Sequence, residues 1–226
     1  MTHVSVIIVA AGSGLRLGAR VPKAFVSLNG KPMVEYSLQA FQECQSVAEI
    51  ILVKPAFYQI NGLRYFGKYP KLLAIVPGGQ ERLDSVRAGL NMVSQDSKVI
   101  LIHDAARPLI RAEQIAAVAR TAERYGAAIL AVPVTDTIKQ IKAGRITGTV
   151  DRSHLWKAQT PQGFKRQLLK RSHFNRKNVP ATDDSQLVEM IKGKVHIVPG
   201  NDSNIKITTP VDLEMASWLL KKKNLE

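Results

Sequence analysis

The sequence predicts an α/β fold, a doubly wound and mostly parallel sheet with helices on both faces. Apolar, β-branched runs alternate with helical runs three times in the first part of the chain, which is typical of parallel βαβ units. A glycine-rich turn follows directly on the first apolar run, residues 5–10. Ligands bind beyond the carboxyl ends of the strands in such sheets, so we expect the site in the loops at that edge.

Length and composition fit one domain with a substantial core. The chain has 226 residues, 45% of them hydrophobic, and could form one α/β domain or two small ones; we expect a single domain over 1–226. No run of about eighteen apolar residues occurs and Met1 to His3 lead straight into a strand, so we expect neither a membrane span nor a signal peptide. The single cysteine, Cys44, excludes an internal disulfide, is expected to be buried, and fits the reducing cytoplasm.

The net charge of +14 indicates an anionic partner. A basic surface suits nucleic acid, and it equally suits two small anions such as a triphosphate and a sugar phosphate. The basic residues are scattered, and we interpret the stretches 165–177 and 221–223 as solvated faces. Aromatic residues are not interleaved with these stretches, which argues against a nucleic-acid-binding protein.

The glycine loop after the first strand is the first candidate for function. Gly12, Gly14 and Gly18 let the backbone turn tightly and bring its N–H groups close to an anion. Arg16 and Lys23 add two cations beside them. The loop is therefore a candidate phosphate cradle, with an ordinary strand-to-helix turn as the alternative.

The spacing separates this loop from two other glycine loops. A Rossmann loop has the pattern G-x-G-x-x-G and an acidic residue at the end of the second strand, whereas here Gly18 comes one residue late and the second strand ends on Lys54. A Walker A loop needs G-x-x-x-x-G-K-[ST], which no register of this segment supplies. A loop with Arg16 and Lys23 seven residues apart suits a nucleoside triphosphate whose α-phosphate is attacked.

Apolar spacing and turn residues predict the next elements. Met33, Leu38 and Phe41 recur at helical spacing, which predicts a helix over 33–44 after the turn pair Asn29–Gly30. The further elements expected in this half are a strand over 49–53, a helix over 55–66 ended by Gly67, and a strand over 72–76. This order brings the carboxyl ends of three strands to one edge of the sheet.

A second candidate loop follows the strand over 72–76. The backbone amides of the Gly78–Gly79 turn could read the edge of a base, and Ser85 could donate to the base or the ribose. Ser85 could equally cap the helix that begins there. The local sequence leaves both interpretations open.

Asp104 ends the next apolar strand, 98–103, and is the metal candidate. A carboxylate at the end of a buried strand is costly unless something pairs with it. One carboxylate together with nucleotide phosphates is the usual magnesium arrangement. A salt bridge to Arg107 is the alternative, although Arg107 is better used on an oxyanion of the second substrate. We expect His103 to be a core histidine rather than a catalyst.

A protruding hairpin interrupts the alternation of strands and helices. A helix over 111–125, ended by Gly126, and a strand over 127–132 precede it. Residues 133–162 alternate too weakly for a core and are expected to form an arm with its turn at 143–145. An arm that buries little of itself normally packs on another surface, most often a second copy of the chain. A flexible insertion is the alternative.

The last part of the chain returns to the body at residues 160–162. Thr182 fits the N-cap of the following helix, and the aspartates after it suit the positive end of the helix dipole. A strand over 195–198 and an amphipathic helix over 210–220 complete the elements. Between the strand and the helix, Lys206 stands between two isoleucines and is expected to point away from the apolar face.

Four separated motifs together resemble a known family. They are A-A-G-x-G-x-R-x-G with P-K (10–23), G-G-x-x-R-x-x-S-V (78–86), T-P-Q (160–162) and N-I-K-[IV]-T (204–208). In this order they are similar to the sugar-phosphate nucleotidyltransferases, and most closely to the 2-C-methyl-D-erythritol 4-phosphate cytidylyltransferases of the non-mevalonate isoprenoid pathway. The resemblance covers nearly the whole chain.

The resemblance implies a fold of nucleotide-diphospho-sugar transferase type and a Mg²⁺-dependent transfer of CMP from CTP to 2-C-methyl-D-erythritol 4-phosphate. It also implies a homodimer in which the ends of the arm reach the neighbouring site. The implied site residues in this chain are catalytic Arg16, Lys23 and Lys206; CTP-binding Ala11, Gly12, Gly14, Gly79 and Ser85; substrate-binding Arg107, Thr137, Arg152 and Thr182; and metal-binding Asp104.

Two points stay open at this stage. The family has an acidic residue directly before the asparagine of N-I-K, where this chain has Ser203, so Asp202 either substitutes for that acid or does not. A cytidylyltransferase acting on ribitol 5-phosphate shares the fold, the metal and most motifs; the segments 150–152 and 155–156 favour methylerythritol phosphate. A basic nucleic-acid-binding protein that kept the fold is the alternative of another class.

Overall fold

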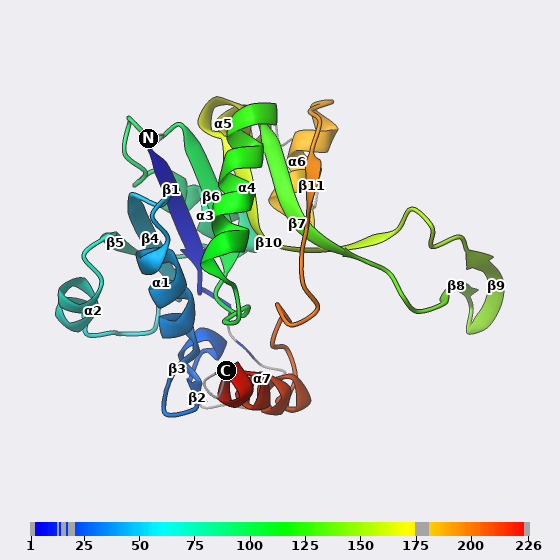
Figure 1. The fold of residues 1–226 in the computed structure, drawn as a ribbon, viewed down its shortest axis with the longest axis horizontal. Coiled ribbons are helices and arrows are strands. Elements are labelled where there is room, and N and C mark those ends of the chain that lie inside the picture. The colour runs from blue at the N-terminus through cyan, green and yellow to red at the C-terminus, as the bar shows by residue number, and fades with distance from the viewer. Residues whose placement is uncertain (1–2, 13, 15–16, 18–20, 175–180, 224–226) are drawn as a thin grey trace.

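A seven-stranded sheet forms the centre of the computed structural model, which describes residues 3–12, 14, 17, 21–174 and 181–223 (Figure 1). Its strands are β1 (Val4–Val9), β4 (Glu49–Lys54), β5 (Leu72–Pro77), β6 (Val99–Asp104), β7 (Ala127–Pro133), β10 (Trp156–Lys165) and β11 (His196–Pro199). They lie in the order β11-β7-β10-β6-β1-β4-β5. Only β10 is antiparallel to its neighbours, β6 and β7. The predicted mostly parallel α/β sheet is confirmed.

Helices cover both faces of this sheet. They are α1 (Met33–Glu43), α2 (Gly62–Lys68) and α4 (Ala112–Tyr125) on one face, and α3 (Arg82–Leu90), α5 (Arg166–Phe174) and α6 (Asp184–Met190) on the other. Strand β1 is buried on both sides, because successive residues point to opposite faces: Val6 and Ile8 enter the first core and Ile7 the second. The loops at its carboxyl end are therefore anchored from both layers.

A smaller unit covers the carboxyl edge of the sheet. The hairpin β2 (Ser27–Leu28) and β3 (Lys31–Pro32) turns at Asn29 and Gly30, whose φ values are 48° and 84°. Helix α7 (Pro210–Lys223) packs against it, and Leu28, Met33 and Ala216 share one apolar cluster there. Within the described part of the chain, no helix is long and apolar enough to cross a bilayer.

The helix predicted over 55–66 is wrong. Helix α2 begins only after Asn61, whose side chain accepts a hydrogen bond from the amide of Arg64, and Gly67 lies inside the helix. The residues before it form a loop because Lys54 holds them in place: its ammonium donates to the carbonyls of Pro55 and Tyr58.

The protruding arm is confirmed, with different boundaries. Strands β8 (Ile138–Lys142) and β9 (Arg145–Val150) form a separate hairpin that stands away from the body (Figure 1). The amide of Val134 donates to the carbonyl of Leu155 and closes the base of the arm. The predicted range 133–162 extends too far, because β10 already joins the central sheet. Strand β10 contains the buried residues Gln159 and Gln162, whose side chains hydrogen-bond within the body.

A buried carboxylate at the amino edge of the sheet yields a stability prediction. Glu49 accepts hydrogen bonds from the hydroxyls of Ser5 and Ser94. Burial alone raises the pKa of Glu49, but these bonds and the nearby His3 lower it below its ordinary value. The stabilisation is therefore present above about pH 4.3 and is lost as the pH falls further. We expect Glu49→Gln to cost about 1–3 kcal/mol at pH 7 and less near pH 3, measured by urea unfolding. An equal cost at both pH values would contradict this.

Candidate active site

A cavity of about 480 Å³ opens at the carboxyl ends of β1 and β6, beside the loops that follow β4 and β5. The sequence-predicted residues that line it are Ala11, Gly12, Lys23, Gly79, Ser85, Asp104 and Lys206. These residues come from four separated parts of the chain. The structure thus brings together the glycine loop, the second glycine turn, the end of β6 and the segment before α7 in one site.

Two lysines that are far apart in the sequence, Lys23 and Lys206, line this cavity. Lys23 opens the 3₁₀ helix η2 (Lys23–Phe25), and its ammonium donates to the carbonyl of Ile207 at 3.0 Å. Ile207 is buried, so its neighbour Lys206 is turned toward the cavity, as the alternation predicted. The cavity therefore has cationic side chains from both ends of the chain.

Gly14 serves the site indirectly. Its φ is +73°, and a Cβ built there would lie 2.6 Å from the Cβ of Lys23. The position therefore needs glycine for the close approach of Lys23 and for its backbone conformation. Gly12 has open space around its Cα and lines the cavity itself. Arg16, the other predicted catalytic residue of this loop, lies outside the described residues.

Asp104 stands at the end of β6 between two cations. Its carboxylate accepts from Nε of Arg82 at 3.1 Å and from Nζ of Lys206 at 2.7 Å. Burial alone raises the pKa of Asp104, and the charges of Arg82 and Lys206 more than offset this, so the pKa lies well below its ordinary value. The carboxylate is ionised throughout the neutral range. The hydroxyl of Thr160 in turn accepts from the Asp104 amide and fixes the strand end.

Arg107 has a different environment from the one predicted. The alternative for Asp104 was a salt bridge to Arg107, but Asp104 pairs with Arg82 and Lys206 instead. The guanidinium of Arg107 donates to the carbonyls of Asn204 and Ala158. Burial lowers the pKa of Arg107 below its ordinary value. In this structure Arg107 therefore ties the Lys206 segment to strand β10 of the central sheet.

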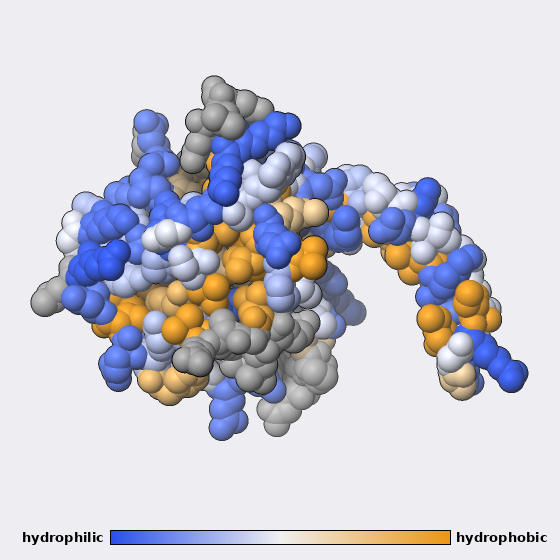
Figure 2. Space-filling view, turned by 90° about the horizontal axis from the view of Figure 1, so that it is seen from below, coloured by the Kyte–Doolittle hydropathy of each residue, from blue (hydrophilic) through white to orange (hydrophobic). Residues whose placement is uncertain are grey.

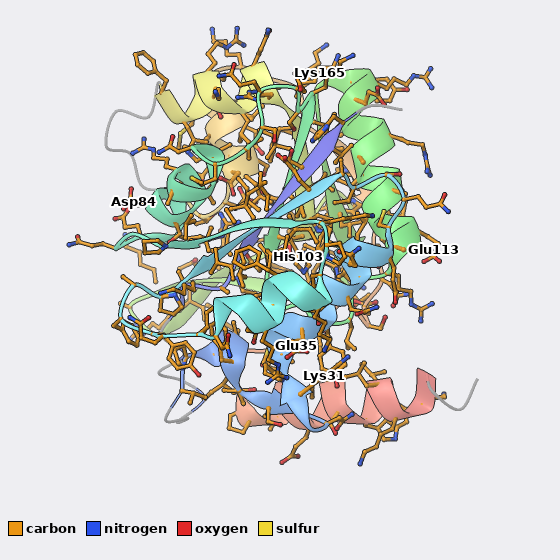
Figure 3. The ribbon with its side chains drawn as sticks, turned by 90° about the vertical axis from the view of Figure 1, so that its left-hand side faces the viewer. Lys31, Glu35, Asp84, His103, Glu113 and Lys165 are labelled. Atoms are coloured by element: carbon orange, nitrogen blue, oxygen red, sulfur yellow. The ribbon has the colours of Figure 1, made fainter. Side chains whose placement is uncertain are left out.

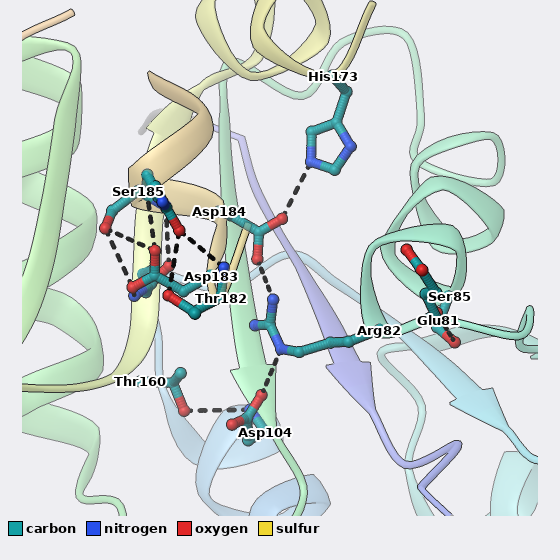
Figure 4. Close-up of polar contacts among 12 residues, drawn as sticks. Glu81, Arg82, Ser85, Asp104, Thr160, His173, Thr182, Asp183, Asp184 and Ser185 are labelled. Atoms are coloured by element: carbon teal, nitrogen blue, oxygen red, sulfur yellow. Dashed lines mark hydrogen bonds and ion pairs between the residues drawn. The ribbon is translucent and has the colours of Figure 1, made fainter. Parts of the chain in front are cut away.

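Sequence reasoning missed Arg82. It is the first residue of α3 and lines the cavity between Asp104 and Asp184 (Figure 4). Burial alone would lower the pKa of Arg82, while the charges of the two aspartates raise it above its ordinary value. The signal was present, because Arg82 is the arginine of G-G-x-x-R-x-x-S-V. That motif was interpreted only for its glycines and its serine.

Ser85 holds the second glycine turn. Its hydroxyl accepts from the amide of Gly79 and donates to the carbonyl of Glu81, both at 3.2 Å. The N-cap of α3 is Glu81, so the interpretation of Ser85 as the cap is wrong. A Cβ at Gly79 would lie 2.5 Å from the Cβ of Asp84, so the turn packs against α3 only because glycine stands there.

The remaining substrate-binding candidates lie apart from this cavity. Thr137 and Arg152 are exposed on the arm, and Arg152 donates to the carbonyl of Thr135 across its base. Thr182 donates to the side chain of Gln186 and is not the N-cap. That position belongs to Asp183, whose carboxylate accepts from an amide of the first turn of α6.

The expectation that His103 is a core histidine is confirmed. His103 lies in the interior (Figure 3), bonded to Thr160, and burial lowers its pKa to about 3.

Phe57 is an exposed aromatic residue at the cavity. Its side chain is 74% exposed and lines the cavity. It sits in the loop that was predicted as a helix, which is why its role could not be inferred from the sequence.

Comparison with known proteins identifies the family of this chain. The sequence model of the 2-C-methyl-D-erythritol 4-phosphate cytidylyltransferase family matches residues 4–222. A protein of that name from Pelotomaculum thermopropionicum is 40% identical over 99% of this chain and 96% of its own length. Another from Bacillus velezensis is 42% identical over 97% and 96%.

The fold agrees as well. A crystal structure of 4-diphosphocytidyl-2C-methyl-D-erythritol synthase from Anaerococcus prevotii superimposes with a TM-score of 0.86, at 30% identity, over 97% of this chain and 96% of that one. The chain therefore belongs to the 2-C-methyl-D-erythritol 4-phosphate cytidylyltransferase family.

Proposed function

We propose that this chain transfers CMP from CTP to 2-C-methyl-D-erythritol 4-phosphate, giving 4-diphosphocytidyl-2-C-methyl-D-erythritol and pyrophosphate. One observation carries the proposal beside the family membership: Lys23, Lys206 and the Asp104–Arg82 pair converge on one cavity beside a glycine loop. Such a cavity suits a triphosphate. We also propose that the protein works in the cytoplasm, consistent with its single, buried cysteine.

The reaction needs no nucleophile from the protein. The phosphate oxygen of the polyol phosphate attacks the α-phosphorus of CTP, and the bond to the pyrophosphate oxygen breaks in line. The chain has to hold two anions together and stabilise the charge that gathers on the phosphorus. Lys23 and Lys206 supply positive charge at the cavity wall, and the glycine loop supplies backbone amides.

A divalent cation fits the residues present. Asp104 is an ionised carboxylate on the cavity wall, and Mg²⁺ is usually bound by one or two carboxylates plus substrate phosphates. Within the described residues, no group of three or more acidic, histidine or cysteine side chains could form an all-protein metal cage. We propose that Asp104 holds Mg²⁺ together with the triphosphate, and the ion neutralises phosphate charge there.

We propose that two copies of the chain pair through their arms. The arm stands clear of its own body, and Figure 2 shows hydrophobic surface along it. Ile141 and Ile146 are paired across β8 and β9 and are 67% and 66% exposed. Such apolar residues on a projecting hairpin need a partner. Pairing would carry Thr137 and Arg152 to the partner's cavity, where they would contact the polyol phosphate.

A substitution on the arm tests the dimer. We expect Ile141→Lys with Ile146→Lys to give a monomer by light scattering, because paired lysines repel and cannot be buried. The acceptor KM should rise at least about tenfold while CTP binding stays within about twofold. Leu73→Lys, an exposed apolar residue on β5, is the matched control. A monomer with the normal acceptor KM would show that the arm plays no part in the site.

Phe57 yields a prediction about nucleotide affinity. Its loop is fixed by Lys54 and by the packing of Phe25 on Tyr58, whose ring centroids lie 4.7 Å apart, so the exposed ring is held at the cavity. We expect Phe57→Ala to raise the KM for CTP about fivefold with kcat unchanged, since about 1 kcal/mol of apolar contact is lost. Phe174→Ala, an exposed phenylalanine away from the cavity, should change neither. An unchanged KM for CTP in Phe57→Ala would contradict the contact.

The proposed function is tested by pyrophosphate release from CTP and Mg²⁺, with methylerythritol 4-phosphate and ribitol 5-phosphate offered in parallel. Release with the first alone supports the proposal. Release with ribitol 5-phosphate alone would show that the protein acts on that acceptor instead. If neither acceptor gives pyrophosphate release, the proposed cytidylyltransferase activity on these acceptors is wrong. A gel shift with polynucleotide at several salt concentrations covers the nucleic-acid alternative.

A further inference from the structure

A chain of ion pairs leads from the cavity into the interior (Figure 4). Arg82 donates from Nε to Asp104 at 3.1 Å and from Nη1 to Asp184 at 2.6 Å. The other carboxylate oxygen of Asp184 lies 3.0 Å from Nε2 of His173. Arg82 and Asp104 line the cavity, whereas Asp184 and His173 are buried away from it between α3, α5 and α6. The guanidinium is therefore held between a carboxylate at the cavity and one in the interior.

A contribution to the stability of the fold does not by itself explain why the acidic side chain of Asp184 is buried in this ion pair. Its side chain is fully buried, and a buried ion pair often contributes no more than well-packed apolar residues would. What the pair does provide is geometry. Two carboxylates bind different nitrogens of one planar guanidinium, and this fixes the plane in which the remaining N–H groups point.

The two anchors of Arg82 differ in what happens to them during the reaction. Asp104 lies on the cavity wall and is the carboxylate that we assign to the cation, so its charge is shared once CTP and Mg²⁺ bind. Asp184 is sealed from the cavity, and its second oxygen is occupied by His173. Only the Asp184 anchor is therefore undisturbed by ligands.

We propose that Asp184 is a positioning residue: it holds Arg82 at the cavity wall, where the guanidinium binds the triphosphate and the leaving pyrophosphate. His173 fixes the orientation of Asp184 in turn. This inference rests on the proposed function, since it assigns Arg82 to the phosphates of CTP. It adds to the site a buried residue that never touches the substrate.

A double-mutant cycle in the full-length protein tests it. We expect Asp184→Asn, which keeps the shape and removes the charge, to lower kcat about tenfold or more while the acceptor KM stays within about twofold. In the Arg82→Ala background the same substitution should change kcat by less than about twofold, because the group it positions is gone. Independent, multiplicative effects of the two substitutions would overturn the proposal.

Two further variants separate positioning from stability. Glu35 (Figure 3) is a buried carboxylate on α1 that pairs with Lys68 and Arg64 of α2 and is not among the described residues that line the cavity. Glu35→Gln should lower Tm as Asp184→Asn does and leave kcat within about twofold. Asp184→Glu should recover part of the activity, because it restores the charge. Loss of kcat in Glu35→Gln equal to that in Asp184→Asn would mean that destabilisation explains both.

A readout without turnover keeps this test separate from the proposed function. The side-chain Nε–H of Arg82 gives its own ¹H–¹⁵N signal, and a guanidinium fixed by two carboxylates should show slow rotation and slow hydrogen exchange. We expect this signal to broaden or vanish in Asp184→Asn and to persist in Glu35→Gln. An Arg82 signal unchanged by Asp184→Asn would overturn the positioning role. Absence of pyrophosphate release by the wild type would overturn only the function.

Discussion

Replacement of Lys23 by alanine is expected to lower kcat by about a hundredfold or more and to leave the fold intact. A hundredfold loss corresponds to about 2.7 kcal/mol of transition-state stabilisation, within the range for one positioned charge in a water-poor site. The ammonium of Lys23 is fixed by the carbonyl of Ile207 and by the close packing of Gly14 on its Cβ. Its charge is therefore already in place before CTP binds.

The measurement is steady-state pyrophosphate release, with thermal unfolding to verify the fold. Lys170→Ala removes the same charge from an exposed position on α5 and should leave turnover unchanged. Lys23→Arg should retain more turnover than Lys23→Ala, because it keeps the charge with altered geometry. Near-normal turnover in Lys23→Ala would remove Lys23 from the catalytic machinery. From the sequence we expect the same loss of turnover in Arg16→Ala, although Arg16 lies outside the described residues.

Local patterns predicted the parts of the fold that depend on local chemistry. Buried strands such as β1 were predicted correctly from their continuous apolar, β-branched runs. The turns at Asn29–Gly30 and at 143–145 were predicted from turn residues, chiefly their glycines, and Gly30 and Gly144 both adopt positive φ. Lys23, Asp104 and Lys206 were assigned because they end strands or stand in motifs, and the topology brings such ends together.

Two of the three failures arise from long-range contacts, and one arises from a local contact that the apolar pattern does not show. The loop before α2 has an apolar composition that suits a helix, yet a lysine from the preceding strand holds its carbonyls instead. The weak alternation of residues 133–162 placed the end of the arm too late, because Gln159 and Gln162 are buried and bonded to distant segments. Arg82 looks like a surface residue of α3 until Asp184, more than a hundred positions later, is placed beside it.

Asp104→Asn is expected to have the other large effect, and its two consequences have opposite signs. Asp104 offsets the charges of Arg82 and Lys206, so its loss makes the cavity more positive. CTP without metal should therefore bind at least as tightly as to the wild type. Turnover should fall by about a hundredfold or more, and the Mg²⁺ concentration for half-maximal rate should rise at least about tenfold, because the protein's carboxylate for the ion is gone.

These opposite changes distinguish a metal ligand from a structural counter-ion. If Asp104 served only to neutralise its cations, Asp104→Asn would change stability and leave the Mg²⁺ dependence as it was. The fold should tolerate the substitution, since Arg82 keeps its pair with Asp184 and Lys206 is partly exposed. Calorimetric titration with CTP in EDTA and rate measurements over a Mg²⁺ series provide the two readouts.

The pKa of Asp104 adds a test by pH. Arg82 and Lys206 hold that pKa well below its ordinary value, so the stabilisation from the ion pairs is present above about pH 3.9 and is lost as the pH falls further. Any fall in activity between pH 5 and 7 must then come from other groups. We expect the acid limb of the wild-type pH profile to persist in the residual activity of Asp104→Asn. Its disappearance would mean that the carboxylate titrates in that range and that the two cations do not hold it ionised.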